Sequence, residues 1–333
     1  MRDLIPPGIN YIADNIVTKH NILGAPKGFG AKWAKSLGLP KKAETIFFAG
    51  CGYQYTSNLE ALMSVIRRLD NSKLGAELPM GLAGLQKKFG VDVTGLYGKF
   101  AVKDSDTGSK PLTAAINVLA YYGIDVGYLA EEEPCCGGLL YYSGMEDKFN
   151  QHVNQMYSKL KSCDVRRIIS IVPSCTYTIR NLMPRYIDNF NIEVKHFLEI
   201  VIENLHRSEL RYPEEVRIVY HDPCQLSRYL GFVNEPRHIL RSIKGIELVD
   251  VDWAGGEWST CCGGGGGFEA VFPELSHILA VNRARELVET GAQIIVTHCP
   301  GCIMQLQNGL KEIEKEHIQV LDIAEILATS MGV

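Results

Sequence analysis

Short apolar runs alternate with amphipathic segments from Thr45 to the end of the chain, as in proteins whose strands and helices pack in layers. In the first half the apolar runs predict strands at Ile46–Ala49, Asp125–Leu129, Arg167–Val172 and Glu193–His196. In the second half they predict strands at Arg217–Tyr220, Glu247–Asp250, Gln293–Thr297 and Gln319–Leu321. We therefore expect an α/β protein.

The two halves of this pattern match each other in more than rhythm. Ile192–Ile200 aligns with Ile318–Ile326, and each stretch follows the last of the clustered cysteines in its half. Duplication of one unit is the simplest explanation, so we expect two pseudo-symmetric, Rossmann-like halves. The predicted domains are residues 45–210 and 211–333, each with a cysteine motif at its strand ends. An extended N-terminal arm over residues 1–44, which wraps a partner or the body, is expected to precede them.

The second half contains five cysteines in a C-x36-CC-x36-CxxC pattern: Cys224, Cys261, Cys262, Cys299 and Cys302. Glycines follow the adjacent pair directly, and glycine allows the tight turn that brings two neighbouring sulfurs to one centre. Gly263 and Gly264 are the candidate cofactor-contacting residues of this turn. Five thiolates exceed the four ligands of a structural zinc site, so the pattern favours an iron–sulfur cluster. Zinc and unligated buried cysteines are the alternatives.

The first half repeats this motif with one cysteine fewer: Cys51, Cys135, Cys136 with Gly137, and Cys175, with Val172 in the place of the missing cysteine. Four thiolates suit a cubane cluster or zinc, and an unusual cluster or an empty site are further alternatives. The cysteines of both motifs follow predicted strands, where α/β sheets place their sites.

The first half is also longer between its first two cysteines. Cys51 and Cys135 are 84 positions apart, whereas Cys224 and Cys261 are 37 apart, a difference of 47. We place the additional residues within 71–111, as a lid or a partner-binding insert.

Several residues beside the second motif are candidates for supporting roles. His221 and His298 are positioned to donate hydrogen bonds to sulfur or protons to a substrate, although structural histidines are more common at such places. Arg228 either binds an anionic substrate or caps a helix. Trp253 and Trp258 are expected to shield the centre from water, as ordinary packing would also require.

Composition narrows the class of protein. The chain has 333 residues and a formal net charge of −4 without a basic stripe, which argues against nucleic acid as a partner. No secretory signal precedes the ten cysteines, so we expect metal ligands in the reducing cytoplasm rather than disulfides. The most apolar stretch, Leu112–Ala130, is interrupted by polar residues, so we expect no membrane span and any membrane contact only through a partner.

Two CCG boxes, Glu133–Gly138 and Ser259–Gly264, together with Asp222–Cys224 and His298–Cys302, resemble the cysteine-rich domain of heterodisulfide reductases. That domain occurs in their B-type and D-type subunits and in iron–sulfur subunits of glycolate, lactate and glycerol-3-phosphate oxidoreductases. The resemblance covers residues 45 to 330 and implies that an intact five-cysteine motif binds a noncubane 4Fe-4S cluster at which a disulfide is cleaved in one-electron steps.

For this chain, the resemblance implies a noncubane cluster at the second motif and an electron-relaying cluster, or zinc, at the first. The implied partners are a ferredoxin-like C-type subunit, a flavoprotein and a small thiol or disulfide substrate. The segment Leu23–Pro40 is similar to the linker that follows a ferredoxin domain in D-type subunits, but no ferredoxin motif precedes it. The alternatives are a relay subunit of a hydroxy-acid, acyl-CoA or quinone-linked oxidoreductase, and a zinc-stapled scaffold.

Overall fold

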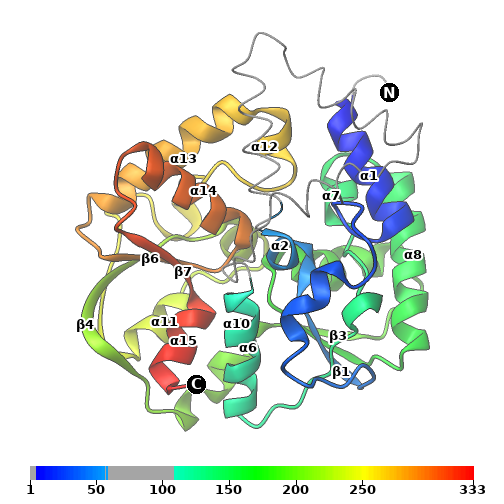
Figure 1. The fold of residues 1–333 in the computed structure, drawn as a ribbon, viewed down its shortest axis with the longest axis horizontal. Coiled ribbons are helices and arrows are strands. Elements are labelled where there is room, and N and C mark those ends of the chain that lie inside the picture. The colour runs from blue at the N-terminus through cyan, green and yellow to red at the C-terminus, as the bar shows by residue number, and fades with distance from the viewer. Residues whose placement is uncertain (1–4, 57, 59–108) are drawn as a thin grey trace.

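A computed structural model describes residues 5–56, 58 and 109–333 of the chain (Figure 1). The predicted insert at 71–111 lies outside the described residues except for 109–111. The described strands form two parallel sheets. The first sheet has the order β1-β2-β3, with bounds Thr45–Phe48, Arg167–Ser170 and Glu193–His196. The second has the order β5-β4-β6-β7, and in chain order its strands β4 to β7 are Arg211–Tyr220, Lys244–Val249, Ile294–Thr297 and Gln319–Asp322.

The predicted strand at Asp125–Leu129 is wrong, because only one bridge pair forms there, between Gly127 and Ile46. Gly127 uses both its N–H and its carbonyl toward β1, so Leu129 would be the next residue to pair, but Leu129 has helical angles (φ −68°, ψ −11°) before a 3-10 helix at Ala130–Glu132 and the ladder ends. The bridge nevertheless lies on the edge of β1 that corresponds to the position of β5. Both halves therefore have one strand order, as duplication predicts.

Helices connect the strands and cover the sheets (Figure 1). In the first half these are α2 (Gly50–Gln54), α6 (Lys110–Tyr121), α7 (Gly138–Tyr142), α8 (Glu146–Ser162), α9 (Pro173–Tyr177) and α10 (Phe197–Asn204). In the second half they are α11 (Glu235–Arg241), α12 (Phe268–Val271), α13 (Pro273–Val288), α14 (Pro300–Glu312) and α15 (Ile323–Met331). Helix α6 packs against α15 of the other half, so the two halves share an interface. Among the described helices, none combines the length and apolarity that a membrane span requires.

The last strand–helix unit of each half shows the duplication in detail. The side chain of His196 accepts from the Leu198 N–H at the start of α10, and Asp322 accepts from the Ala324 N–H at the start of α15. In both helices a glutamate three residues after the cap accepts from the backbone N–H of the capping residue, which completes a capping box. The same local device therefore begins the same helix in each half.

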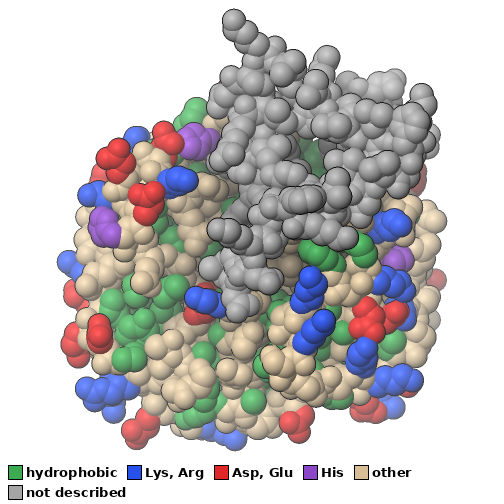
Figure 2. Space-filling model, in the orientation of Figure 1, with side chains coloured by type: hydrophobic (Ala, Val, Ile, Leu, Met, Phe, Trp, Pro, Cys, Tyr) green, Lys and Arg blue, Asp and Glu red, His purple; other side chains and the backbone are tan. Residues whose placement is uncertain are grey.

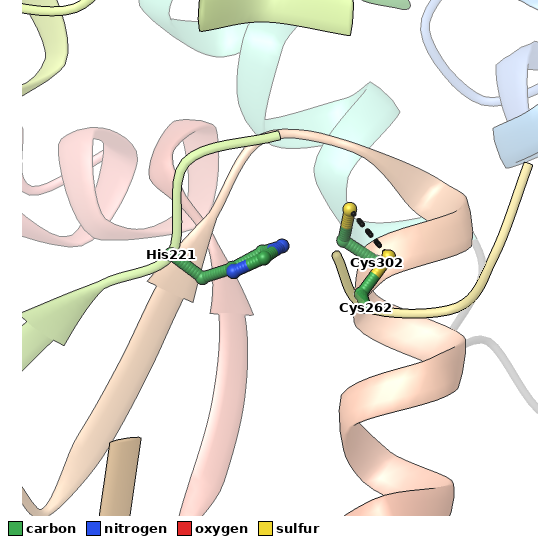
Figure 3. A group of neighbouring side chains, drawn as sticks. All are labelled: His221, Cys262 and Cys302. Carbon is green, nitrogen blue, oxygen red and sulfur yellow. Dashed lines mark hydrogen bonds between the residues drawn. The ribbon is translucent and has the colours of Figure 1, made fainter. Parts of the chain in front are cut away.

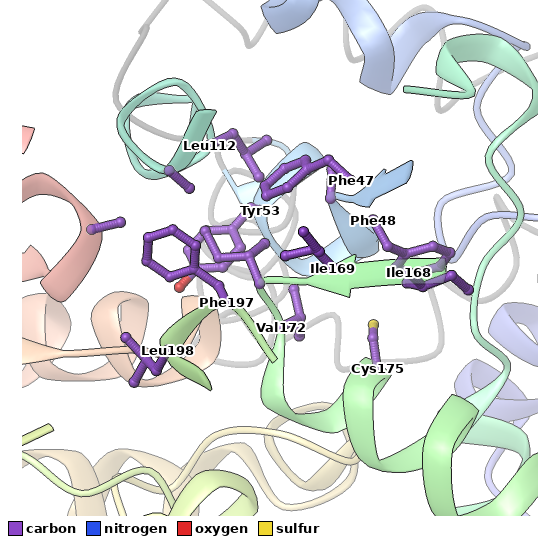
Figure 4. Packing of buried hydrophobic residues seen from close by; sticks show 14 of the residues in the cluster. Phe47, Phe48, Tyr53, Leu112, Ile168, Ile169, Val172, Cys175, Phe197 and Leu198 are labelled. Carbon is purple, nitrogen blue, oxygen red and sulfur yellow. The ribbon is translucent and has the colours of Figure 1, made fainter. Parts of the chain in front are cut away.

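The hydrophobic core of the first half extends up to its cysteines. Phe47, Phe48, Ile168 and Ile169 come from β1 and β2 and are fully or almost fully buried, and Val172 continues this surface to Cys175 (Figure 4). This packing fixes the strand ends, which in turn fix the cysteine-bearing loops.

The N-terminal arm is not extended throughout, contrary to the prediction. Residues Pro7–Lys19 form helix α1, and Phe29–Ala34 form a 3-10 helix. Ile9, Ala13 and Ile16 lie on one helical face and are buried, and α1 packs against α8 and α12. The arm thus covers elements of both halves. On the face shown in Figure 2, basic and acidic side chains are interspersed, consistent with the absence of a basic stripe in the sequence.

Candidate metal centres

The second cysteine group assembles at the carboxyl ends of β4 and β6. Cys224 follows β4 after a three-residue turn, whereas Cys299 and Cys302 follow β6 at the start of α14. Cys261 and Cys262 come from the loop that precedes α12. Because β4 and β6 are parallel neighbours, their carboxyl ends lie at one edge of the sheet, and the loop brings the adjacent pair to that edge.

The sulfurs of this group are in mutual contact. Cys262 Sγ and Cys302 Sγ are 3.2 Å apart, and a ring nitrogen of His221 lies within 4.8 Å of both (Figure 3). Cys261 hydrogen-bonds to Cys262, and Cys299 to Cys302. Burial, with the nearby charges of Cys299 and Cys262, raises the pKa of the Cys224 thiol to about 11. All five predicted cysteines therefore lie together.

The thiol of Cys262 favours the deprotonated, thiolate form more than the other thiols of this group. Hydrogen bonds with Cys261 and Cys302, and the neighbouring His221, hold the pKa of Cys262 well below its usual value. The hydrogen bonds with Cys262 raise the pKa values of Cys261 and Cys302. The group stabilises one negative charge in a buried place, which a metal cation would share among all its sulfurs.

The glycines after the adjacent pair shape the turn as expected. Gly263 has φ +81°, and a side-chain Cβ there would lie 2.2 Å from the Ser276 carbonyl oxygen on α13. Its N–H donates to Cys261 Sγ at 3.3 Å. A Cβ on Gly264 would lie 2.8 Å from Gln305 Cγ. Only glycine fits at these two positions without displacing a neighbour.

The first cysteine group is assembled in the same way. Cys135 hydrogen-bonds to Cys136 and to Cys51, and Cys136 to Cys175, and all four cysteines are buried. The N–H of Gly137 donates to Cys135 Sγ at 3.4 Å, as Gly263 does in the other half. The four predicted cysteines therefore also lie together.

Val172 lies where the fifth cysteine of this group would be. A Cβ placed on Gly50, next to Cys51, would meet Val172 Cγ2 at 2.9 Å and Cys175 Sγ at 3.0 Å. The valine side chain is thus buried beside the sulfur of Cys175 (Figure 4). An apolar side chain fills this corner of the first group, whereas Cys299 contributes a thiol in the second.

Glu133 was not among the predicted site residues, yet it holds the start of α2 beside Cys51. Its carboxylate accepts from the N–H groups of Ala49 and Gly50, both at 2.9 Å, directly before Cys51. Burial raises the pKa of Glu133 to about 8. Its position immediately before the Pro–Cys–Cys sequence was the available signal.

The residues predicted to support the second group differ in whether the structure places them as expected. Trp253 and Trp258 do not shield it, because they are 73% and 79% exposed on the loop outside the turn. Arg228 donates to the carbonyl oxygens of Glu257 and Ser259 at the C-terminal end of a 3-10 helix (Gly256–Trp258), so it caps a helix rather than facing a free anion site. His298 Nδ1 bonds to Asp322 at 2.8 Å rather than to a sulfur.

The two groups meet across the interface between the halves. A Cβ on Gly52, next to Cys51, would lie 2.5 Å from Pro300 Cγ, next to Cys299. The Tyr53 hydroxyl donates to the buried carboxylate of Asp322. Helix α2, which carries the first cysteine of one half, therefore packs directly on the start of α14, which carries the last two cysteines of the other.

This paired architecture matches a known domain. The family model described as a cysteine-rich domain, CCG, matches residues 101–180 and 218–307, one copy in each half. The chain belongs to the CCG cysteine-rich domain family. The duplication expected from the sequence is thus a duplication of CCG domains.

Curated relatives of this CCG protein are oxidoreductase subunits. It is 30% identical over 225 residues to the D-type subunit of dihydromethanophenazine:CoB–CoM heterodisulfide reductase from Methanosarcina barkeri, covering 66% of this chain and 54% of the relative. It is 31% identical over 246 residues to EtfAB:quinone oxidoreductase of Syntrophomonas wolfei, covering 71% and 34%. It is 30% identical over 215 residues to the B-type subunit of fumarate reductase (CoM/CoB) from Methanothermobacter marburgensis, covering 64% and 42%. The chain thus spans about half or less of the length of these relatives.

Proposed function

We propose that this CCG protein is an iron–sulfur subunit of a heterodisulfide-reductase-like complex. Its second cysteine group would hold a noncubane 4Fe-4S cluster at which a disulfide or another sulfur-bearing substrate is reduced or formed. Its first group would hold a second cluster that relays electrons. The observation that carries the proposal is the convergence of five thiols from three separate segments on one place.

The donor set of the second group fits an iron–sulfur cluster better than zinc. Five sulfurs are one more than a tetrahedral zinc site uses, and the backbone N–H of Gly263 already points at one of them. Cys262 and Cys302 are buried, Cys224 and Cys299 are partly buried and Cys261 is exposed. A small substrate would therefore approach from the side of Cys261.

The donor set of the first group fits a relay. Its four cysteines are all buried, and Val172 closes the corner where the second group has a further thiol. Four thiolates without an open side suit a cluster that exchanges electrons but binds no substrate. The close contact of Gly52 with Pro300 supports electron transfer over a short distance between the two cysteine groups.

When bound, a cluster of this kind supplies single electrons and an iron site for a sulfur ligand. The residues of the chain have separate tasks around it. Cysteines of three segments would hold it, the Gly263 N–H donates to the sulfur of the candidate ligand Cys261, and the buried strand ends of β4 and β6 would keep water from its inner side.

The proposed partners are a ferredoxin-like C-type subunit and a flavoprotein that deliver electrons to the first group. Support comes from the relatives, which are named as reductase or oxidoreductase subunits and are longer than this chain. The arm, which packs on α8 of the first half and α12 of the second, is the proposed surface for such a partner.

Disulfide turnover with a reduced viologen as donor tests the proposal, with Cys302→Ser and Cys163→Ser as a matched pair. Cys163 is partly buried at the end of α8 and belongs to neither group. We expect Cys302→Ser to lose turnover and about half of the bound iron, and Cys163→Ser to retain both. Full turnover by Cys302→Ser would overturn the proposal.

A second candidate is a relay subunit that has no substrate of its own. The relatives named as a quinone oxidoreductase and a fumarate reductase subunit favour it. It predicts clusters in both groups, reduction by the partner, and no disulfide turnover by the purified complex with viologen.

A further inference from the structure

His221 is the only residue besides cysteine in the cluster of candidate ligands found among the described residues. It directly follows β4 and is buried, and one ring nitrogen faces the sulfurs of Cys262 and Cys302 (Figure 3). A histidine with two cysteines resembles part of a zinc site. The hydrogen bond at the other ring nitrogen of His221 decides whether the ring can bind a metal or donates a hydrogen bond to sulfur.

That hydrogen bond comes from Arg283 on α13. The Arg283 Nε–H donates to His221 Nδ1 at 3.1 Å. A guanidinium group has donors only, so Nδ1 must carry a lone pair, and the hydrogen of the neutral ring must sit on Nε2. A zinc-bound Nε2 would need the opposite arrangement, with the hydrogen on Nδ1. The ring therefore presents an N–H, not a lone pair, to the sulfurs.

Arg283 is itself fixed on every side and fully buried. Its two terminal nitrogens donate to Glu286 at 2.8 Å, Thr260 Oγ1 at 3.2 Å and Ser259 Oγ at 3.2 Å. Ser259 and Thr260 directly precede the adjacent cysteines. One guanidinium therefore positions both the loop that carries Cys261 and Cys262 and the donor ring, and its charge is paired with Glu286.

The first group has no counterpart to this pair in the described residues. The residue three positions before Cys51 is the buried Phe48, whereas His221 lies three positions before Cys224, and the strand registers give the same equivalence. The nearest histidine, His152, donates from Nε2 to the Cys135 carbonyl at 2.7 Å rather than to a sulfur. The backbone donors Gly137 and Gly263 are matched, so the asymmetry lies in His221 and Arg283.

We propose that His221, positioned by Arg283, donates an N–H···S hydrogen bond to the sulfur of Cys262 and raises the reduction potential of the second centre above that of the first. The inference rests on the proposed function, since it requires clusters in both groups. N–H donors to the ligand sulfurs stabilise the more negative, reduced state of a cluster. A single electron from a ferredoxin-like partner then reduces the first centre, and the first centre is oxidised again when it passes this electron to the second centre.

An anaerobic redox titration followed by EPR tests this, using His221→Leu, His221→Gln and Arg283→Met. We expect His221→Leu to lower the ratio of reduced to oxidised second centre at a fixed potential about tenfold, or ~59 mV for one electron, as for the loss of one charge-assisted hydrogen bond. His221→Gln keeps a hydrogen-bond donor, so we expect a smaller decrease in the reduction potential of the second centre. Arg283→Met should change this potential in the same direction as His221→Leu. The reduction potential of the first centre should stay the same in all three variants.

The exposed His206 provides the control, because His206→Leu should leave both potentials unchanged. An unchanged second-centre potential in His221→Leu overturns the inference while the proposed function stands. If His221→Leu fails to load iron, equal potentials in His221→Gln, Arg283→Met and the parent protein overturn it instead. Absence of iron from the parent protein would refute the proposed function itself.

Discussion

Replacing Gly263 by alanine should release the second centre while leaving the first intact. The backbone there has φ +81°, and alanine in this region costs about 1–2 kcal/mol. The new Cβ would also lie 2.2 Å from the Ser276 carbonyl oxygen, a backbone atom of α13 that cannot rotate away. Displacing the loop adds about 1–3 kcal/mol. Because Gly263 also donates to Cys261 Sγ, the displacement moves a candidate ligand.

Gly266 in the same loop separates these two costs. It has φ +64°, and a Cβ there would meet no heavy atom within 4 Å, so Gly266→Ala carries only the conformational cost. The assay is iron and acid-labile sulfide per chain, with urea unfolding of the same samples. We expect Gly263→Ala to lose about half of the iron and Gly266→Ala to retain it. Equal iron loss in the two variants would refute the role assigned to the turn.

Three further predictions concern other parts of the two centres. Val172→Cys restores the missing thiol beside Cys175, and we expect the EPR spectrum of the first centre to change while its iron content stays; an unchanged spectrum would show that this position is not a ligand site. Arg237→Met leaves the buried Asp222 carboxylate, which it binds at 2.6 and 2.9 Å, without its cation and should lower the free energy of unfolding by about 3–5 kcal/mol. Arg241→Met, which breaks an exposed pair, should cost about 0–1 kcal/mol in the same urea titration, and similar losses would contradict this. Burial raises the pKa of Glu325 from 4.5 to about 7, so the folded state binds its proton more tightly and stability from this group, present below pH 4.5, is lost as the pH rises through 7. Glu325→Gln should remove a fall on the order of 2 kcal/mol between pH 4.5 and 7.5 in urea unfolding, and an identical pH dependence in variant and parent would exclude Glu325 as its cause.

The local pattern of apolar and polar residues was sufficient to predict most of the fold. Apolar runs located all the strands β1 to β7, because a buried parallel strand needs apolar side chains on both faces, but β4 begins at Arg211, six residues before its predicted start, where its side chains are mostly exposed. The pattern failed at Gly127, which forms only a bridge, because Leu129 two residues later has helical angles and leads into a 3-10 helix instead of continuing along β1. The helix in the arm, in contrast, was visible as the spacing of Ile9, Ala13 and Ile16.

The cysteines of both centres could be grouped from spacing alone, because each follows a strand end and parallel strands end at one edge. Their surroundings could not. In the sequence, Arg283 resembles an exposed helix residue. Only the packing of α13 against the loop that carries Cys261 and Cys262 shows that it is buried. Trp253 and Trp258 were expected to be covered because of their size, yet both point into solvent.

The metal content of the protein tests the central claim most directly. The protein should be purified without oxygen, and iron, acid-labile sulfide and zinc measured per chain, with EPR after partial oxidation in the presence of a thiol. Two four-iron clusters predict about eight irons and a similar amount of sulfide, with a signal from the second centre that Cys302→Ser lacks. Stoichiometric zinc with almost no iron would contradict the account.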